Sequence, residues 1–78
     1  MNDKMSHDKI LYERLREKRN EIAQKEGVKP YMVFQNEVLA QISEKKPATR
    51  EELAQVKGMG PKKMARYGQL VLQMVNHQ

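Results

Sequence analysis

Apolar residues recur at helical spacing in four stretches of this 78-residue chain, and glycine or proline separates each stretch from the next. Side chains three and four residues apart lie on one face of a helix, and an apolar face of this kind is buried against other helices. No stretch alternates apolar and polar residues as a convincing strand does. The spacing therefore predicts an all-α fold of four helices, with one short segment left to assign.

The first predicted helix covers about residues 8–26. Its apolar face is interrupted near Lys18 and Arg19, where we expect a long aliphatic stem to cover the core while its charge reaches solvent. Gly27 suits a left-handed cap, and Pro30 favours extended backbone at the residue before it, so the helix should end there. The apolar face consists of Leu11, Leu15, Ile22 and Ala23.

The segment 29–34 is apolar without helical spacing, and its length favours a connector with at most a single extra helical turn near Tyr31. Asn36 then offers an N-cap for a second helix, which should end near residues 45–46, before Pro47. The apolar face of that helix consists of Val38, Leu39 and Ile42.

Capping signals predict two further helices. Thr49, followed three residues later by Glu52, forms a capping box and predicts a short third helix. Residues 58–60, Gly-Met-Gly, end that helix, and Pro61 suits the first position of a fourth helix that extends almost to the C-terminus. The apolar side of the third helix carries Leu53 and Val56, and that of the fourth carries Met64, Tyr67, Val71 and Met74.

Composition restricts the class of protein. Hydrophobic residues make up 38% of the chain and charged residues 32%, which is too apolar for a disordered tail and too polar for a membrane protein. No run approaches the roughly 18 apolar residues of a membrane span, and no signal peptide is visible. Without cysteine there is no disulfide and no thiolate site. We expect a cytoplasmic monomer with one helical domain, residues 9–78, after a flexible segment, residues 1–8.

Charge is distributed unevenly along the chain. There are 15 basic and 10 acidic residues, and no acidic residue follows Glu52. The acid-free stretch carries Lys57, Lys62, Lys63 and Arg66 close together. A positive field that is uncompensated in sequence favours a polyanionic partner. The alternative is that these are ordinary solvated side chains that keep the protein soluble.

A glycine turn lies in the same region. The run Leu53-x-x-Val56-x-Gly58-Met59-Gly60-Pro61-x-x-Met64-Ala65 resembles a helix-hairpin-helix motif, in which a Gly-hydrophobic-Gly turn joins two short helices. Glycines allow positive φ and close backbone approach, and the first N–H groups of the following helix can bind a phosphate. The alternative is that the glycines only make a tight corner while Met59 packs into the core. The candidate phosphate contacts are Lys57, Gly58, Gly60, Lys62, Lys63 and Arg66.

Tyr31 is a separate candidate. It follows Lys29 and Pro30, so a ring and a cation lie together in a rigid connector. An exposed ring of this kind can stack on an unpaired base. The alternative is that Tyr31 packs against the first helix beside Phe34. We expect Phe34 and Tyr67 in the core, because both lie within apolar stretches.

Two arginines of the first predicted helix are weaker candidates. Arg16 and Arg19 would extend the basic surface along that helix. Glutamates are interspersed with them, however, and ordinary intrahelical ion pairs are an equally good explanation of both side chains. The sequence leaves the two explanations open.

The sequence contains few of the histidine, serine and cysteine residues that often form catalytic sites. The histidines, His7 and His77, lie at opposite ends of the chain, and the serines are Ser6 and Ser43. No nucleophile–base–acid set is visible, and neither a zinc site nor a two-metal site can be assembled. We therefore expect a non-catalytic domain with no cofactor and no metal ion.

Two series of landmarks run from Leu15 to Gly68, within a resemblance that covers about residues 9–76. The first reads Leu15-Arg16-x-x-Arg19-x-x-x-Ala23, then Gly27-Val28-x-Pro30-Tyr31-x-Val33-Phe34. The second reads Leu39-x-x-Ile42, then Pro47-x-Thr49-x-x-x-Leu53-x-x-Val56-x-Gly58-Met59-Gly60, then Arg66-Tyr67-Gly68. In order and approximate spacing they resemble the HRDC domain (helicase and RNase D C-terminal) of RecQ-family helicases and RNase D-type exonucleases.

The resemblance implies a compact bundle of four to five short helices containing the helix-hairpin-helix-like turn, and an auxiliary role. We expect weak, salt-dependent binding to single-stranded or partly duplex DNA, with RNA also possible, which targets a RecQ-type helicase to its substrate. In a bacterium the protein would be associated with the nucleoid. The alternative is a docking module for other domains of a parent helicase or nuclease, using an apolar patch such as Met32, Val33 and Met59.

Overall fold

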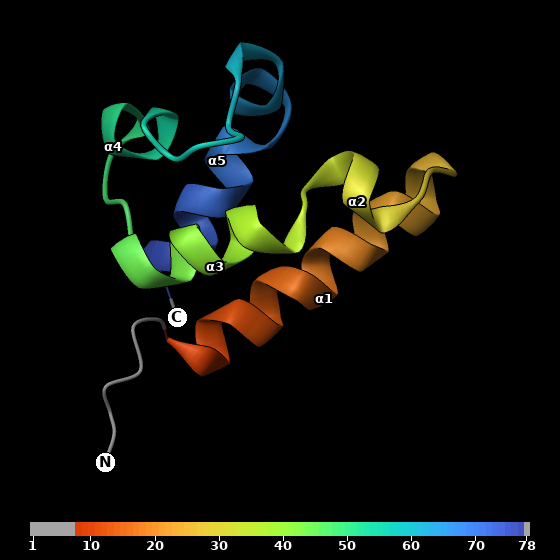
Figure 1. The fold of residues 1–78 in the computed structure, drawn as a ribbon, viewed down its shortest axis with the longest axis horizontal. Coiled ribbons are helices and arrows are strands. Elements are labelled where there is room, and N and C mark those ends of the chain that lie inside the picture. Colours follow the sequence, from red (N-terminus) through yellow and green to blue (C-terminus); the bar gives the residue numbers. More distant parts are fainter. Residues whose placement is uncertain (1–7, 78) are drawn as a thin grey trace.

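Helix α1 (Lys9–Glu26) is the longest element of the structure, a computed structural model that describes residues 8–77 (Figure 1). Asp8 caps its start, because the Asp8 carboxylate accepts a hydrogen bond from the Leu11 N–H at 3.0 Å, which lowers the pKa of Asp8. Gly27 caps its end in the left-handed conformation, with φ of 71°. The predicted bounds and left-handed cap are confirmed. Asp8, expected in a flexible segment, belongs to the folded domain, and residues 1–7 of that segment lie outside the described residues.

Four shorter helices follow: α2 (Pro30–Val33), α3 (Asn36–Lys45), α4 (Arg50–Ala54) and α5 (Pro61–Asn76). Residues 8–77 contain no strand, so the all-α prediction is confirmed, and α2 is the single extra turn expected near Tyr31. The prediction of Asn36 as an N-cap is wrong by one residue, because Gln35 occupies the cap position and Asn36 is the first residue of α3. Within the described part of the chain, no helix has both the length and the apolar character that crossing a membrane requires.

The core lies between α1 and the other helices. α1 contacts α2, α3 and α5, and α4 contacts α5 (Figure 1). As predicted, Leu11, Leu15 and Ala23 of α1 are buried, whereas Ile22 is only partly buried. The remaining buried apolar side chains are Val33, Phe34, Val38, Leu39, Ile42, Leu53, Val56, Met59, Tyr67, Val71 and Val75.

The burial of side chains in this core tests three expectations about apolar residues. Phe34 and Tyr67 are buried as predicted, and their rings meet edge to face with centroids 5.2 Å apart. Val33 and Met59 are 1% and 4% exposed, so the expected apolar docking patch is wrong at both residues. Only Met32 of that patch remains on the surface, where it is 54% exposed.

Arg19 is buried although it carries a charge, with only 7% of the residue exposed. Its Nη1 donates to the Phe34 carbonyl at 2.8 Å and to Asn36 Oδ1 at 2.9 Å, and its Nε donates to Asn20 Oδ1 at 3.0 Å. Burial lowers the pKa of Arg19 from its ordinary value. The expectation that this charge reaches solvent is wrong, because the chain between α2 and α3 presents a carbonyl that the guanidinium satisfies.

Arg19→Ala should lower the free energy of unfolding by about 2 kcal/mol, because it leaves the buried Phe34 carbonyl without its charged donor. The matched control is Arg14→Ala, which removes an exposed arginine from the same helix and should change stability by less than about 0.5 kcal/mol. Urea unfolding followed by circular dichroism measures both. Equal midpoints for the two variants would show that the Arg19 contacts do not stabilise the fold.

Candidate nucleic-acid interface

α4 and α5 are joined by the predicted glycine turn. Thr49 caps α4 as expected, since its Oγ1 accepts the Glu52 N–H at 3.2 Å. The Glu52 carboxylate accepts the Ala48 N–H at 2.8 Å, one residue before the position of a standard capping box. Pro61 is the first residue of α5, also as predicted. The two helices and their glycine turn are therefore arranged as the motif implies.

Gly58 is required by the packing of this turn. Its φ is +94°, and a Cβ built on it would lie 2.6 Å from Val38 Cγ2 of α3. The turn therefore runs directly over α3, where no side chain fits. Met59, the next residue, points into the core. Gly58 therefore makes a tight corner and Met59 is buried, as the alternative expected, while a direct phosphate contact by Gly58 stays a prediction.

Gly60 differs, because a Cβ at this position would meet no atom within 4 Å. Gly60 is the N-cap of α5, and the first intrahelical bond of α5 runs from the Met64 N–H to the Gly60 carbonyl at 2.9 Å. Of the residues between them, Pro61 has no N–H, whereas Lys62 and Lys63 carry backbone N–H groups that have no acceptor within the helix. An open hollow of about 620 Å³ lies in front of them, lined by Val56, Gly58, Met59, Gly60, Pro61, Lys62 and Lys63.

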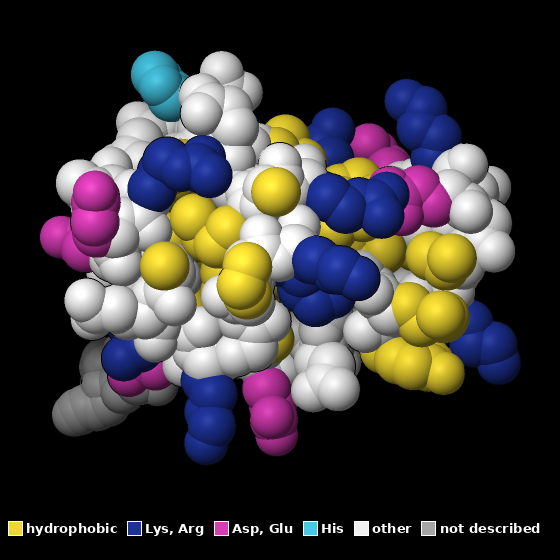
Figure 2. Space-filling model, turned by 90° about the horizontal axis from the view of Figure 1, so that it is seen from above, with side chains coloured by type: hydrophobic (Ala, Val, Ile, Leu, Met, Phe, Trp, Pro, Cys, Tyr) yellow, Lys and Arg dark blue, Asp and Glu magenta, His cyan; other side chains and the backbone are white. Residues whose placement is uncertain are grey.

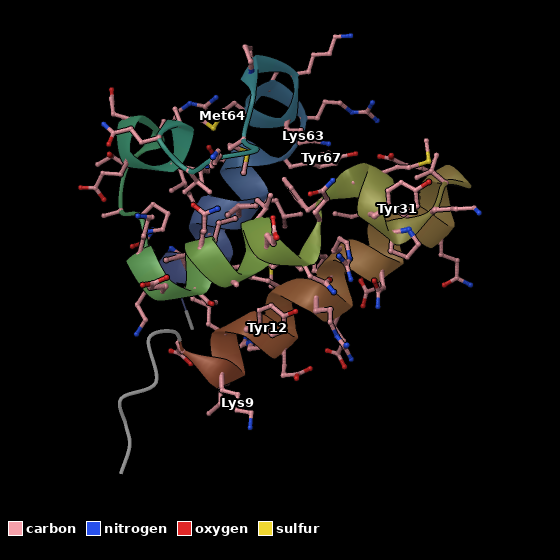
Figure 3. All side chains as sticks on the ribbon, in the orientation of Figure 1. Lys9, Tyr12, Tyr31, Lys63, Met64 and Tyr67 are labelled. Atoms are coloured by element: carbon pink, nitrogen blue, oxygen red, sulfur yellow. The ribbon has the colours of Figure 1, made fainter. Side chains whose placement is uncertain are left out.

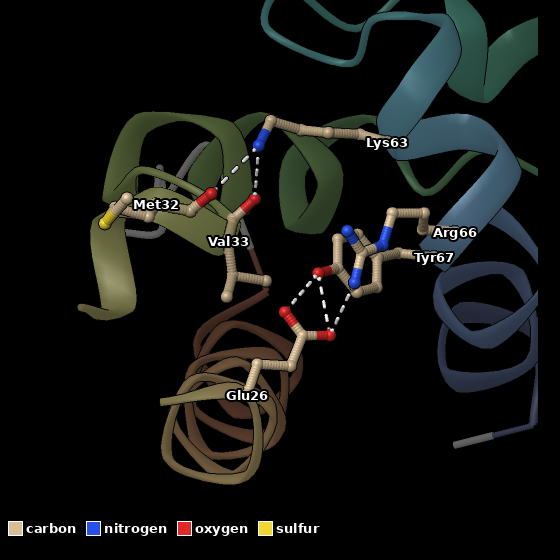
Figure 4. Close-up of polar contacts among 6 residues, drawn as sticks. All are labelled: Glu26, Met32, Val33, Lys63, Arg66 and Tyr67. Atoms are coloured by element: carbon tan, nitrogen blue, oxygen red, sulfur yellow. Dashed lines mark hydrogen bonds and ion pairs between the residues drawn. The ribbon is translucent and has the colours of Figure 1, made fainter. Parts of the chain in front are cut away.

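The predicted cations at the start of α5 divide into two kinds. Lys57 and Lys62 are exposed, and neither side chain forms a hydrogen bond or ion pair with a residue in the range 8–77. Lys63 is half-buried, and its Nζ donates to the carbonyls of Met32 at 3.2 Å and Val33 at 2.8 Å (Figure 4). Lys63 therefore joins α5 to α2, while Lys57 and Lys62 remain available to a ligand.

Arg66 is paired with an acid from the other half of the chain (Figure 4). Its Nη2 lies 3.0 Å from Glu26 Oε2, and the Tyr67 hydroxyl donates to Glu26 Oε1 at 3.0 Å and to Oε2 at 3.2 Å. Burial, and then the Glu26 carboxylate, raise the pKa of Tyr67, so its hydroxyl stays protonated and acts as a donor. The stretch after Glu52 contains no acidic residue, but the fold brings the Glu26 carboxylate next to it.

Tyr31 lies on α2, the helix whose last carbonyls accept hydrogen bonds from Lys63 (Figure 3). It is 60% exposed, so the alternative that it packs in the core is wrong. α2 directs Val33 inward and leaves Tyr31 and Met32 outside. Lys29, at the cap position of α2, is also exposed, and its side chain has no partner among the described residues. Seen from above, Lys and Arg side chains gather between apolar areas on this side (Figure 2).

The two arginines of α1 are explained by the fold. Arg16 is exposed and pairs with Glu13 at 3.7 Å, which is the intrahelical alternative left open by the sequence. Arg19 is buried with its donors bound to Asn20, Phe34 and Asn36, so it presents no charge to a ligand. We leave both out of the candidate surface, which we call the basic face and define as Lys29, Tyr31, Lys57, Gly60, Lys62, Lys63 and Arg66.

Among the residues that the structure describes, no serine or histidine belongs to the basic face. Ser43 is fully buried and its hydroxyl donates to the Ala40 carbonyl at 2.9 Å. His77 follows the end of α5, while Ser6 and His7 lie outside the described residues. Within residues 8–77, no group of three or more acidic, histidine or cysteine side chains could bind a metal ion.

Glu26 is a residue of this region that the sequence interpretation missed. A signal was present, because Glu26 is the last residue of a helix, where the helix dipole disfavours an acid. Its partners, Arg66 and Tyr67, lie 40 and 41 positions away, a separation at which helical periodicity carries no information.

Comparisons with known proteins agree with the resemblance stated from the sequence. The family model described as HRDC domain matches residues 8–75. An ATP-dependent DNA helicase RecQ of Bacillus subtilis is 46% identical over 65 residues, which are 83% of this chain and 11% of that protein. An ATP-dependent DNA helicase RecQ of Haemophilus influenzae is 36% identical over 70 residues, which are 90% of this chain and 11% of that protein. The chain thus spans about a tenth of the length of these relatives.

Substitution by alanine should change the stability of the protein differently at the two glycines of the turn. Gly58→Ala should lower the free energy of unfolding by about 2 kcal/mol or more, because it combines a strained positive φ with a clash against Val38. Gly60→Ala is the matched control and should cost less than about 1 kcal/mol, since the position is open and its φ is −78°. Thermal unfolding compares the two. A Gly58→Ala protein as stable as Gly60→Ala would contradict the packing of this turn on α3.

Proposed function

Because the chain belongs to the HRDC domain family, we propose that it is a non-catalytic module that helps a RecQ-type helicase engage single-stranded or partly duplex DNA. The relatives are named as ATP-dependent DNA helicases, and this chain matches only about a tenth of each. In such a protein, ATP hydrolysis and strand separation would belong to the remaining length. The module would contribute affinity for the substrate.

The observation that carries the proposal is the contact between Lys63 and the carbonyls at the end of α2. This contact holds α2, on which Tyr31 is 60% exposed, against α5. Met32 of α2 lines one hollow together with Lys62 and Lys63. Phosphates would bind at the lysines and at the first N–H groups of α5, while an unpaired base would stack on Tyr31. Contacts of this kind do not read base sequence, and salt weakens them.

A second candidate function rests on Tyr31 and Met32. Both side chains are more than half exposed and they are adjacent on α2, so an apolar surface of a neighbouring protein domain could cover them. This docking function needs apolar area from both residues. Base stacking needs the aromatic ring alone, and substitutions at the two positions therefore distinguish the functions.

Lys62→Ala should weaken binding of a short labelled oligothymidylate and should reduce the slope of log K against log salt concentration by about 0.7, the effect of one lost phosphate contact on a single strand. Lys9→Ala is the matched control, because Lys9 is exposed and lies on the opposite side of the molecule from Lys63 (Figure 3). Fluorescence anisotropy at several salt concentrations gives both slopes. The proposed phosphate contact fails if the two variants behave alike.

Tyr31→Ala should reduce affinity for the same oligonucleotide by roughly 1–3 kcal/mol, the value of one stacked base. Tyr31→Phe keeps the ring and should bind almost as the unmodified protein does. Met32→Ala removes the neighbouring exposed side chain and should have little effect on DNA binding. If Met32→Ala and Tyr31→Ala lost affinity equally, apolar contact would explain the result better than stacking.

A further inference from the structure

Glu26 is an acidic residue that lies next to the cations of the basic face. It is one of seven residues that line a hollow of about 220 Å³ between the end of α1, α2 and α5. The others are Val28, Met32, Lys62, Lys63, Arg66 and Tyr67, so three cations surround this one carboxylate. Because the C-terminal end of a helix carries partial negative charge, an acid as the last residue of α1 is electrostatically unfavourable within its own helix. A residue that breaks a local rule in this way is a candidate for a functional role.

Tyr67 fixes the direction of the Glu26 carboxylate. The Tyr67 hydroxyl donates to both carboxylate oxygens, at 3.0 and 3.2 Å, and the Tyr67 ring is buried against Phe34. The second oxygen, Oε2, also receives the Arg66 guanidinium at 3.0 Å. The acid is therefore held towards Arg66 by a rigid neighbour (Figure 4).

The ion pair itself remains accessible. The Arg66 side chain is 62% exposed and the Glu26 side chain is 32% exposed. Ion pairs that water reaches are weak, so a competing anion can displace the carboxylate. A phosphate competes well, because it accepts two parallel hydrogen bonds from one guanidinium.

We propose that Glu26 determines the affinity of the basic face for nucleic acid by occupying Arg66, so that a phosphate gains Arg66 only by displacing this carboxylate. The inference rests on the proposed function, since it assumes that the basic face binds nucleic acid. The exchange replaces one anion by another at Arg66, so this contact adds little net affinity. Tyr67 acts as a positioning residue, because it orients Glu26 and does not itself contact the ligand.

Glu26→Gln keeps the shape of the side chain and an acceptor for the Tyr67 hydroxyl but removes the charge that holds Arg66. Its affinity for a short oligothymidylate at low salt should rise about 2- to 5-fold, the worth of an exposed ion pair. The salt slope should steepen by about 0.7, because Arg66 becomes a full phosphate contact.

Glu44→Gln is the control for net charge. It also removes one negative charge. Glu44 is exposed and lies far from Glu26, at the other end of α1. Its neighbour Ser43 shows this position, because the Ser43 carbonyl accepts the Asp8 N–H at the start of α1. Its affinity should stay close to that of the unmodified protein. If Glu44→Gln gained as much affinity as Glu26→Gln, general charge would explain the gain and the inference would be overturned.

Arg66→Ala, made alone and together with Glu26→Gln, tests the exchange itself. Alone it should weaken binding only slightly, because Arg66 is already occupied, whereas in the double variant it should abolish the gain produced by Glu26→Gln. A gain that persists without Arg66 overturns the inference. Tyr67→Phe keeps the ring packing and should give a smaller gain in affinity together with a steeper salt slope. This variant replaces Glu26→Gln as the test if Glu26→Gln does not fold.

The two proposals fail in different ways. If neither the unmodified protein nor any variant binds the oligonucleotide at low salt, the proposed function fails and the inference fails with it. If the unmodified protein binds through Lys62 but Glu26→Gln binds no better than Glu44→Gln, only the inference fails.

Discussion

The carbonyl oxygens of residues 32–34, at the end of α2, all accept hydrogen bonds from cationic side chains. Arg19 reaches one of them from α1, and Lys63 reaches the other two from α5. A helix of a single turn is not stable alone, and the partial negative charge at its C-terminal end attracts cations. The two cations thus hold α2 between α1 and α5. The position of Tyr31, which is exposed on α2, depends on this arrangement.

The same contacts limit how much of the positive charge can act on a ligand. Of the four cations in the acid-free part of the sequence, Lys63 is bound to carbonyls and Arg66 to Glu26, which leaves Lys57 and Lys62 without partners among the described residues. Net charge therefore overstates the field that a phosphate meets. With Lys29 at the cap position of α2 added, the basic face has three free cations, one occupied arginine and one exposed ring, and such a surface is suited to weak, salt-sensitive binding.

Local signals predicted most of the helices, because caps and turns depend on residues a few positions apart. The left-handed Gly27, the Thr49 cap and the start of α5 at Pro61 are all observed. Asn36 was misassigned because its side chain binds Arg19, 17 positions away. The sequence left open whether Tyr31 is exposed or packed, since residues 31–34 show no period, and the structure shows that it is exposed. The family resemblance, carried by many weak landmarks together, agrees with the match over residues 8–75.

The most direct test of the basic face is an NMR titration of labelled protein with a short single-stranded DNA at low and moderate salt. We expect amide shifts that cluster at residues 57–66 and at Tyr31, that grow smaller as salt rises, and that spare the start of α1. Shifts centred on the Lys9 end of α1, or no shifts at low salt, would contradict the assignment of this face as the nucleic-acid interface.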